Sequence, residues 1–186
     1  MTVDAAVEAV RAGEVVGLPT DTVYGVGADP LNETAVARLF DLKGRPGHRP
    51  VGVLVASLAQ ARMIGEIKGQ VEELAIAHWP GALTLVVTPR VILANWVGDA
   101  QRRTVGVRVP DHPVALQLLE ACGPLAVTSA NRSGGAEARD DVEARSTFGD
   151  EVAVYLPGYA PGGKASTVVD ATGARLVVLR EGPVTL

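Results

Sequence analysis

The sequence is poor in the residues that build disulfide scaffolds and metal centres. It contains one cysteine, Cys122, and therefore no internal disulfide. This cysteine lies in LLEACGPLAV, where we expect a helix end packed against a core, so we interpret it as a buried apolar side chain rather than a nucleophile. The three histidines, His48, His78 and His112, show no metal-ligand spacing with the cysteine or with each other. A disulfide-stabilised or zinc-binding fold is therefore not expected.

Aromatic residues, long apolar runs and excess positive charge are also lacking. Aromatics make up 4% of the 186 residues, so the core must be built from Val, Leu, Ala and Ile. No apolar run reaches membrane-spanning length, and the N-terminus has no basic-then-apolar signal. The formal net charge is −4, so any contact with RNA or a nucleotide requires a local basic patch. We expect a cytoplasmic globular protein without membrane contact, with one domain over residues 1–186.

Helical and strand-like patterns are interleaved along the chain. Helical spacing predicts helices over 2–12, 33–43, 57–65, 70–79, 112–122 and roughly 140–149. For the helix over 33–43, Asn32 is expected to be the N-cap and Gly44 to end the helix in a left-handed conformation. Strands are predicted over 14–18, 51–56, 82–88, 104–110, 124–129, 151–157, 166–171 and 174–180. The last strands leave little room for crossover helices, so the pattern indicates an α/β fold with a mixed sheet.

The stretch LPTDTVYGVGAD, residues 18–29, places hydroxyl side chains and glycines where the first strand ends. Such residues form the wall of a small-molecule pocket, where glycine lets the backbone come close to a ligand. They also form ordinary turns. The stretch by itself leaves both interpretations open.

The stretch KGRPGHRP, residues 43–50, carries Lys43, Arg45, His48 and Arg49 without an acid between them. Its prolines and glycines make it rigid, and rigid uncompensated positive charge suits a polyphosphate or a carboxylate. The alternative is a solvated loop after a helix, because basic residues favour a helix C-terminus.

Three other stretches carry polar side chains next to predicted strands. In TVGVRVPDHP, alternation places Thr104, Gly106 and Arg108 on one face, and Arg108 requires either an anionic partner or a surface salt bridge. In TSANRSGG, Ser129 and Asn131 can hold phosphate, ribose or an amino acid, although the stretch taken alone favours a simple turn before a helix. Arg180, which ends the last strand, indicates nothing by itself.

The stretch GYAPGGKAS, residues 158–166, nearly matches the phosphate-binding loop of nucleotide hydrolases. Ala165 stands where that motif needs a magnesium-binding hydroxyl, and a strand follows where it needs a helix N-terminus. We therefore reject a nucleotide site of that kind, although Ser166 remains available to another site.

Taken in order, seven stretches resemble the YrdC-type family, whose better-known members are threonylcarbamoyl-AMP synthases. They are LPTDTVYGVGAD, KGRPGHRP, WPGALTLVV, TVGVRVPDHP, TSANRSGG, ASTVVD and LREG, and together they cover nearly the whole chain. The resemblance implies a twisted mixed parallel and antiparallel sheet, flanked by helices, with an open cationic cleft. Because the chain ends soon after LREG, it resembles the short, single-domain form of the family.

The resemblance also implies an activity. Members of the family convert L-threonine, bicarbonate and ATP to threonylcarbamoyl-adenylate and pyrophosphate, the first step of a tRNA modification. A separate transferase complex then attaches the threonylcarbamoyl group to tRNA, and a weak direct contact with tRNA or double-stranded RNA is a further expectation. We expect Mg²⁺ to arrive on the ATP phosphates, since no acidic cluster suggests a protein cage for it.

Carried over position by position, the resemblance implies two adjacent sites. The threonine site would comprise Thr22, Arg108, Ser129 and Ser166. The ATP site would comprise Lys43, Arg45, Arg49, Thr104, Asn131 and Arg180. We select Lys43 and Arg45 as the catalytic pair, because the reaction needs growing negative charge to be neutralised and no protein nucleophile.

Two alternatives remain open at this stage. The chain could be a binding module of the same fold that holds RNA or a nucleotide without making an adenylate. It could also be a paralogue that adenylates a different carbamoyl donor. The Lys-x-Arg and Ser-x-Asn pairs favour the threonine enzyme.

Overall fold

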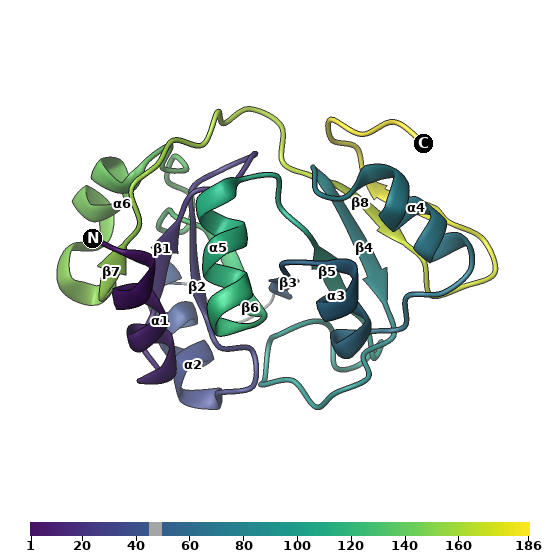
Figure 1. Cartoon of the computed structure of the whole chain (residues 1–186), viewed down its shortest axis with the longest axis horizontal. Helices are drawn as coiled ribbons and strands as arrows, with labels where there is room; N and C mark the ends of the chain where they lie inside the picture. Colours follow the sequence, from purple (N-terminus) through teal and green to yellow (C-terminus); the bar gives the residue numbers. More distant parts are fainter. Residues whose placement is uncertain (45–49) are drawn as a thin grey trace.

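The computed structural model describes residues 1–44 and 50–186, and in them helices and strands alternate as the sequence predicts (Figure 1). The helices are α1 (Val3–Arg11), α2 (Glu33–Lys43), α3 (Leu58–Ile64), α4 (Gln70–His78), α5 (Pro113–Cys122) and α6 (Asp141–Phe148), and a short 3-10 helix η1 (Gly149–Glu151) follows α6. The strands are β1 (Val16–Leu18), β2 (Gly25–Ala28), β3 (Gly52–Leu54), β4 (Leu83–Val87), β5 (Val105–Arg108), β6 (Leu125–Ser129), β7 (Val154–Tyr155), β8 (Thr167–Asp170) and β9 (Val177–Arg180).

The strands of the described residues form one mixed sheet in the order β7-β1-β2-β6-β3-β5-β4-β8-β9. The pairs β1–β7, β3–β5 and β4–β8 are parallel. The pairs β1–β2, β2–β6, β3–β6, β4–β5 and β8–β9 are antiparallel. The expected mixed α/β sheet is therefore confirmed. The order also shows that strands far apart in sequence, such as β4 and β8, are neighbours in space.

Helices cover the two halves of the sheet separately. Apolar side chains of α1 and α5, among them Val10 and Leu118, pack with Leu18 of β1 and Leu125 of β6 in one cluster. In Figure 1 these two helices lie side by side over the half of the sheet that contains β1, β2 and β6. The helices α3 and α4 contact β5 and β4 in the other half.

The ends of α2 are fixed as the sequence predicts. The side chain of Asn32 accepts a hydrogen bond from the backbone N–H of Ala35, which caps the helix N-terminus. Gly44 ends the helix with φ of 59°, a left-handed conformation in which glycine has no side-chain clash. These two ends determine where the last residue of the helix, Lys43, enters the molecule.

The strand β2 was not expected, because its sequence GVGA is poor in residues that favour strands. The structure gives the reason for its glycines. A Cβ atom at Gly25 would lie 2.7 Å from a methyl carbon of Val127, and one at Gly27 would lie 2.9 Å from the other. Both glycines therefore allow β2 to pack closely against Val127 of β6, which places the end of β6 beside the turn that follows β1.

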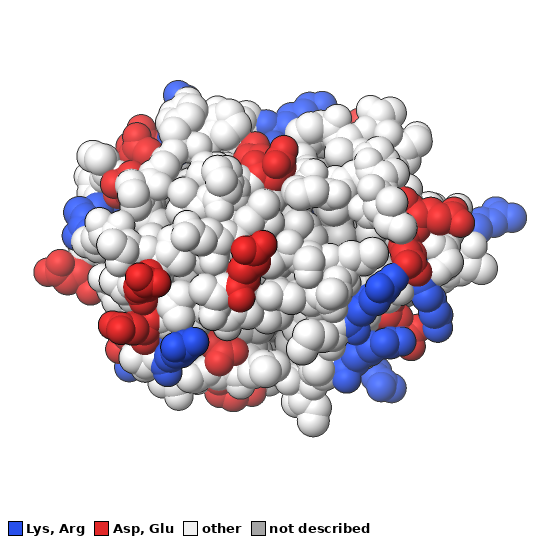
Figure 2. Space-filling view, in the orientation of Figure 1, with Lys and Arg blue, Asp and Glu red and all other residues white. Residues whose placement is uncertain are grey.

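The surface agrees with the negative net charge. Figure 2 shows acidic side chains scattered over the face that carries α5, whereas basic side chains gather mainly toward the end of the molecule near α3. This face therefore offers no continuous positive surface for nucleic acid. Within the described ranges, no helix has the length and apolar character that crossing a bilayer requires.

Candidate functional site

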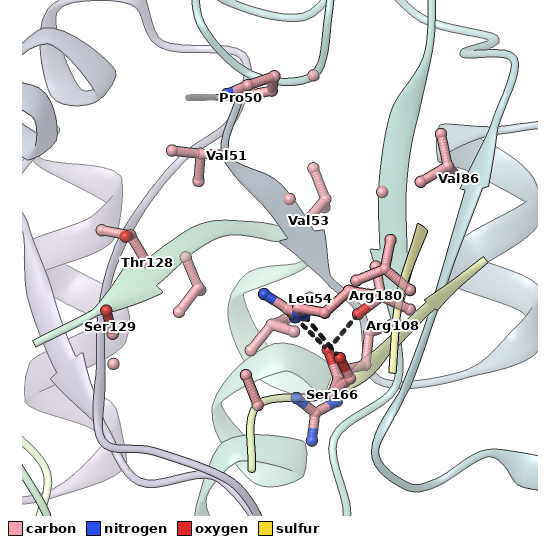
Figure 3. A pocket seen from close by; sticks show the side chains of 18 of the residues that line it. Pro50, Val51, Val53, Leu54, Val86, Arg108, Thr128, Ser129, Ser166 and Arg180 are labelled. Atoms are coloured by element: carbon pink, nitrogen blue, oxygen red, sulfur yellow. Dashed lines mark hydrogen bonds between the residues drawn. The ribbon is translucent and has the colours of Figure 1, made fainter. Parts of the chain in front are cut away.

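A cleft of about 470 Å³ lies against the middle of the sheet, a volume typical of small-molecule sites. Figure 3 shows side chains from distant parts of the chain around it, with Ser129 on one side, Arg108, Ser166 and Arg180 on the other, and Val53 between them. The predicted site residues Thr22, Lys43, Thr104, Arg108, Ser129, Ser166 and Arg180 all line it. The structure thus brings together seven of the residues that the sequence singled out.

On one side of the cleft, the ammonium group of Lys43 is held by the segment that follows β6. Its Nζ donates to the backbone oxygen of Ser129 and to the Oδ1 atom of Asn131, both at 2.6 Å. The same Oδ1 accepts from the Ser129 hydroxyl at 2.8 Å. The Asn131 amide nitrogen donates to the carbonyls of Arg132 and Gly135, so its oxygen must face Lys43. Asn131 lies behind Ser129 and supports the cleft rather than lining it.

Opposite this group, the guanidinium of Arg108 is buried and held at three points. It donates from Nε to the carbonyl of Gly81 at 2.9 Å, from Nη1 to the hydroxyl of Thr22 at 2.9 Å, and from Nη2 to the carboxylate of Asp21 at 2.6 Å. Only 6% of the residue is exposed, so the surface salt bridge considered for Arg108 is excluded. Burial lowers the pKa of Arg108 and the Asp21 charge opposes that shift, so the guanidinium stays protonated.

The threonines after β1 form a turn and a cleft wall at once. The hydroxyl of Thr20 donates to the carbonyl of Val23 at 2.7 Å, as in an ordinary Ser/Thr turn. The Thr20 oxygen also accepts from the backbone N–H groups of Thr22 and Val23, both at 3.2 Å, and lies 3.1 Å from the hydroxyl of Thr22. The Thr22 oxygen accepts from Arg108, and one of its lone pairs remains for a further hydrogen bond. The stretch LPTDTVYGVGAD therefore forms a turn and also lines the cleft, and its binding of a small molecule stays a prediction.

A third wall comes from the C-terminal strands. The hydroxyl of Ser166, just before β8, lies 2.8 Å from the hydroxyl of Thr84 on β4. Arg180, at the end of β9, donates to the backbone oxygen of Ser166 at 3.0 Å and to its hydroxyl at 3.2 Å (Figure 3). The strand end therefore fixes Arg180 at the cleft, a role that its sequence context did not indicate.

The sequence analysis missed further residues that line the cleft. Arg102 lies in a tight turn that is closed by two backbone hydrogen bonds between Asp99 and Thr104. The acidic side chains of Asp99, Glu137 and Asp170 also line the cleft. Hydrogen bonds from Thr172 lower the pKa of Asp170, so this carboxylate is ionised at neutral pH. These residues lie in turns and at strand ends without periodicity, so no sequence signal identified them.

Two predicted site residues, Arg45 and Arg49, lie outside the described residues. The described lining holds four cationic side chains, Lys43, Arg102, Arg108 and Arg180, and three acidic ones. The expectation of a positively lined cleft therefore depends on Arg45 and Arg49 and stays a prediction. No group of three or more potential metal ligands occurs in residues 1–44 and 50–186.

Comparison with known proteins gives consistent matches. The Sua5/YciO/YrdC family model, described as telomere recombination, matches residues 8–182. The chain is 49% identical over 181 residues to a Mycobacterium tuberculosis protein provisionally named threonylcarbamoyl-AMP synthase, covering 96% of this chain and 83% of the relative. It is 40% identical over 182 residues to threonylcarbamoyl-AMP synthase from Vibrio cholerae, with 95% of both chains covered.

Solved structures of similar proteins share the fold. The structure of Pyrococcus abyssi Sua5 complexed with L-threonine matches with a TM-score of 0.90 and 37% identity over 97% of this chain and 54% of that one. This chain thus spans about half the length of that relative. The structure of E. coli YciO matches with a TM-score of 0.86 and 29% identity, covering 97% of this chain and 89% of that chain.

Proposed function

Because this chain belongs to the Sua5/YciO/YrdC family, we propose that it is an L-threonylcarbamoyladenylate synthase. It converts L-threonine, bicarbonate and ATP to threonylcarbamoyl-AMP, pyrophosphate and water. The main support is the cleft itself, which brings a fixed buried arginine and several hydroxyl groups close to a lysine–asparagine pair. A relative that matches over nearly the whole chain, Pyrococcus abyssi Sua5, has been solved with L-threonine.

The threonine subsite is formed by Thr22, Arg108, Ser129 and Ser166. Arg108 has five N–H groups, of which three are used within the protein, so two remain for the substrate carboxylate. The Thr22 oxygen accepts from Arg108 and keeps one lone pair, which suits an N–H of the threonine amine or of the carbamate derived from it. The hydroxyls of Ser129 and Ser166 orient the rest of the amino acid.

The ATP subsite is formed by Lys43, Thr104, Asn131 and Arg180, together with Arg45 and Arg49, which the structure does not describe. Asn131 acts by holding Lys43. The threonine nitrogen attacks CO₂ derived from bicarbonate and loses a proton, and the product of this step is a carbamate. A carbamate oxygen then attacks the α-phosphorus, and the bond to the departing pyrophosphate breaks. Lys43 and Arg45 neutralise the negative charge that grows on the phosphates, and Mg²⁺ arrives bound to ATP.

The product is a mixed anhydride that hydrolyses unless it is consumed. It therefore passes to a transferase complex that modifies tRNA, as the sequence resemblance implies, in the cytoplasm where tRNA is available. A weak direct contact of this chain with tRNA is part of the proposal, and it would not use the face in Figure 2, which has no continuous positive surface.

The test is to incubate the protein with ATP, L-threonine and labelled bicarbonate, and to measure pyrophosphate and labelled threonylcarbamoyl-AMP. We expect pyrophosphate release that requires threonine, and label in the adenylate. Reactions without threonine, or with another amino acid in its place, are the controls. Release that depends on another carbamoyl donor would favour the paralogue, and tight RNA binding without any release would favour the binding module. Either result would overturn the proposal.

A further inference from the structure

Asp21 lies directly behind the threonine subsite, without lining the cleft itself. One of its carboxylate oxygens accepts from Nη2 of Arg108 at 2.6 Å and from the backbone N–H of Asp111 at 3.0 Å. Asp21 belongs to the turn after β1, Arg108 ends β5, and Asp111 precedes α5. The carboxylate therefore ties three separate segments together at one point.

The pair is largely removed from solvent. The exposed fraction of the Arg108 side chain is 7% and that of the Asp21 side chain is 17%. Interactions between charges at such sites are much less screened than on the surface. A buried guanidinium without a carboxylate partner would be costly, because its other two acceptors, Gly81 and Thr22, are neutral.

The attachment points also fix the direction of the guanidinium. Gly81 contributes a backbone carbonyl, and Thr22 is itself held by Thr20, so neither acceptor can follow a moving arginine. With Asp21 on Nη2, one N–H on each terminal nitrogen of Arg108 remains available. Two fixed N–H groups are what bidentate binding of a carboxylate requires.

We propose that Asp21 is a positioning residue for recognition of the substrate carboxylate. It holds Arg108 in place before the amino acid binds, and it compensates the arginine charge while the subsite is empty. Asp21 touches neither substrate, so its effect falls on amino-acid binding and not on the nucleotide. This inference rests on the proposed function, because it takes threonine as the ligand of Arg108.

The test compares Asp21→Ala and Asp21→Asn with the wild-type protein, and Asp111→Asn is the matched control. The control removes a neighbouring negative charge but keeps the backbone N–H that Asp21 accepts. For each variant, kcat and the KM values for threonine and ATP are measured by pyrophosphate release. Threonine binding is measured separately by calorimetry, and thermal unfolding shows whether each variant folds.

We expect Asp21→Ala to weaken threonine binding and raise the threonine KM by about 10- to 100-fold, the usual effect of losing a hydrogen bond to a charged group. Asp21→Asn keeps an oxygen that can accept from Arg108 and should raise this KM by only about three- to tenfold. The KM for ATP should stay within about twofold in both variants, and Asp111→Asn should resemble the wild type. A purely structural role would instead change both KM values together.

Two results would overturn the inference while leaving the proposed function intact. One is an unchanged threonine KM in a folded, active Asp21→Ala variant. The other is tighter threonine binding in that variant, which would mean that Asp21 competes with the substrate for Arg108. If the wild-type protein itself released no pyrophosphate with threonine, the proposed function would fail first, so the two failures are distinguishable.

Discussion

Replacing Lys43 by methionine tests the proposed chemistry most directly, because methionine keeps an apolar stem of similar length and removes only the ammonium group. If this group stabilises charge on the phosphates, its loss should lower kcat/KM by about 10²- to 10³-fold, or about 2.7–4 kcal/mol. The residue is only 4% exposed, and its ammonium group donates to Ser129 and Asn131, so the replacement also removes hydrogen bonds that join α2 to the segment after β6.

The effect of Lys43→Met on stability should be smaller than its effect on catalysis. The variant loses the hydrogen bonds from the ammonium group to Ser129 and Asn131, each worth about 1.5–3 kcal/mol, although both oxygens keep a second donor. The opposite contribution comes from desolvation, because burying the ammonium group destabilises the native protein by on the order of several kcal/mol and the variant avoids this penalty. The opposing contributions should leave the free energy of unfolding within about 2 kcal/mol of the wild-type value.

The assay is threonine-dependent pyrophosphate release, with urea unfolding measured on the same preparations. Lys68→Met is the matched control, because its ammonium group pairs with Glu66 on the surface and its side chain is 73% exposed. The control should retain wild-type turnover. If folded Lys43→Met turned over within a few-fold of the wild type, the catalytic role assigned to Lys43 would be wrong.

Three further predictions follow from the local structure. Gly98→Ala should lower the free energy of unfolding by more than about 2 kcal/mol, because φ is +71° and the added Cβ would overlap the Thr104 carbonyl oxygen. Gly44→Ala should lower it by only about 1 kcal/mol, because φ is +59° but no atom of the described residues lies within 4 Å of the added Cβ. Equal losses of the two variants in urea unfolding would contradict this reasoning. Desolvation lowers the pKa of His112 below 6.5 in the folded protein, so protonation of this side chain favours the unfolded chain. The free energy of unfolding should therefore fall as the pH drops below about 6.5. In His112→Gln the free energy of unfolding should fall less between about pH 7.5 and about pH 5.5, and an unchanged pH dependence would refute the assignment. Cys122 ends α5 as expected, but it is partly rather than fully buried, because it packs at the edge of the cluster under α1 and α5. Partial burial still raises the pKa of Cys122 to about 11, so iodoacetamide should alkylate the thiol slowly at neutral pH until urea unfolds the protein. Rapid alkylation of the folded protein would contradict the interpretation of Cys122 as inert.

Periodicity and capping signals predicted much of the architecture. Alternation in TVGVRVP placed Thr104, Gly106 and Arg108 on one face, and all three line the cleft. The Asn32 cap and the Gly44 terminus of α2 were also predicted and are confirmed. These features depend on neighbouring residues only, so they can be read from one sequence without knowledge of the fold.

Features of the structure that depend on contacts between distant residues could not be predicted from the sequence. Asp21 and Arg108 are 87 positions apart, and nothing in either stretch identifies the other as its partner. The strand β2 likewise depends on Val127, whose methyl groups occupy the space that side chains on Gly25 and Gly27 would need. The site assignments came from the ordered resemblance to a family, and the roles assigned to Arg45 and Arg49 remain predictions.

The strands β8 and β9 form one margin of the sheet, and β9 leaves Val177, Val178 and Leu179 about half exposed. Margins with so little burial are generally the first parts of a protein to open. Yet this margin carries Arg180 and fixes Ser166, while Thr22 and Lys43 approach from segments near the opposite end of the chain. Threonine and ATP bound together would contact both the β8–β9 side and the Thr22–Lys43 side of the cleft and would hold the two sides together. Bound substrates should therefore slow amide hydrogen exchange most strongly in β8 and β9.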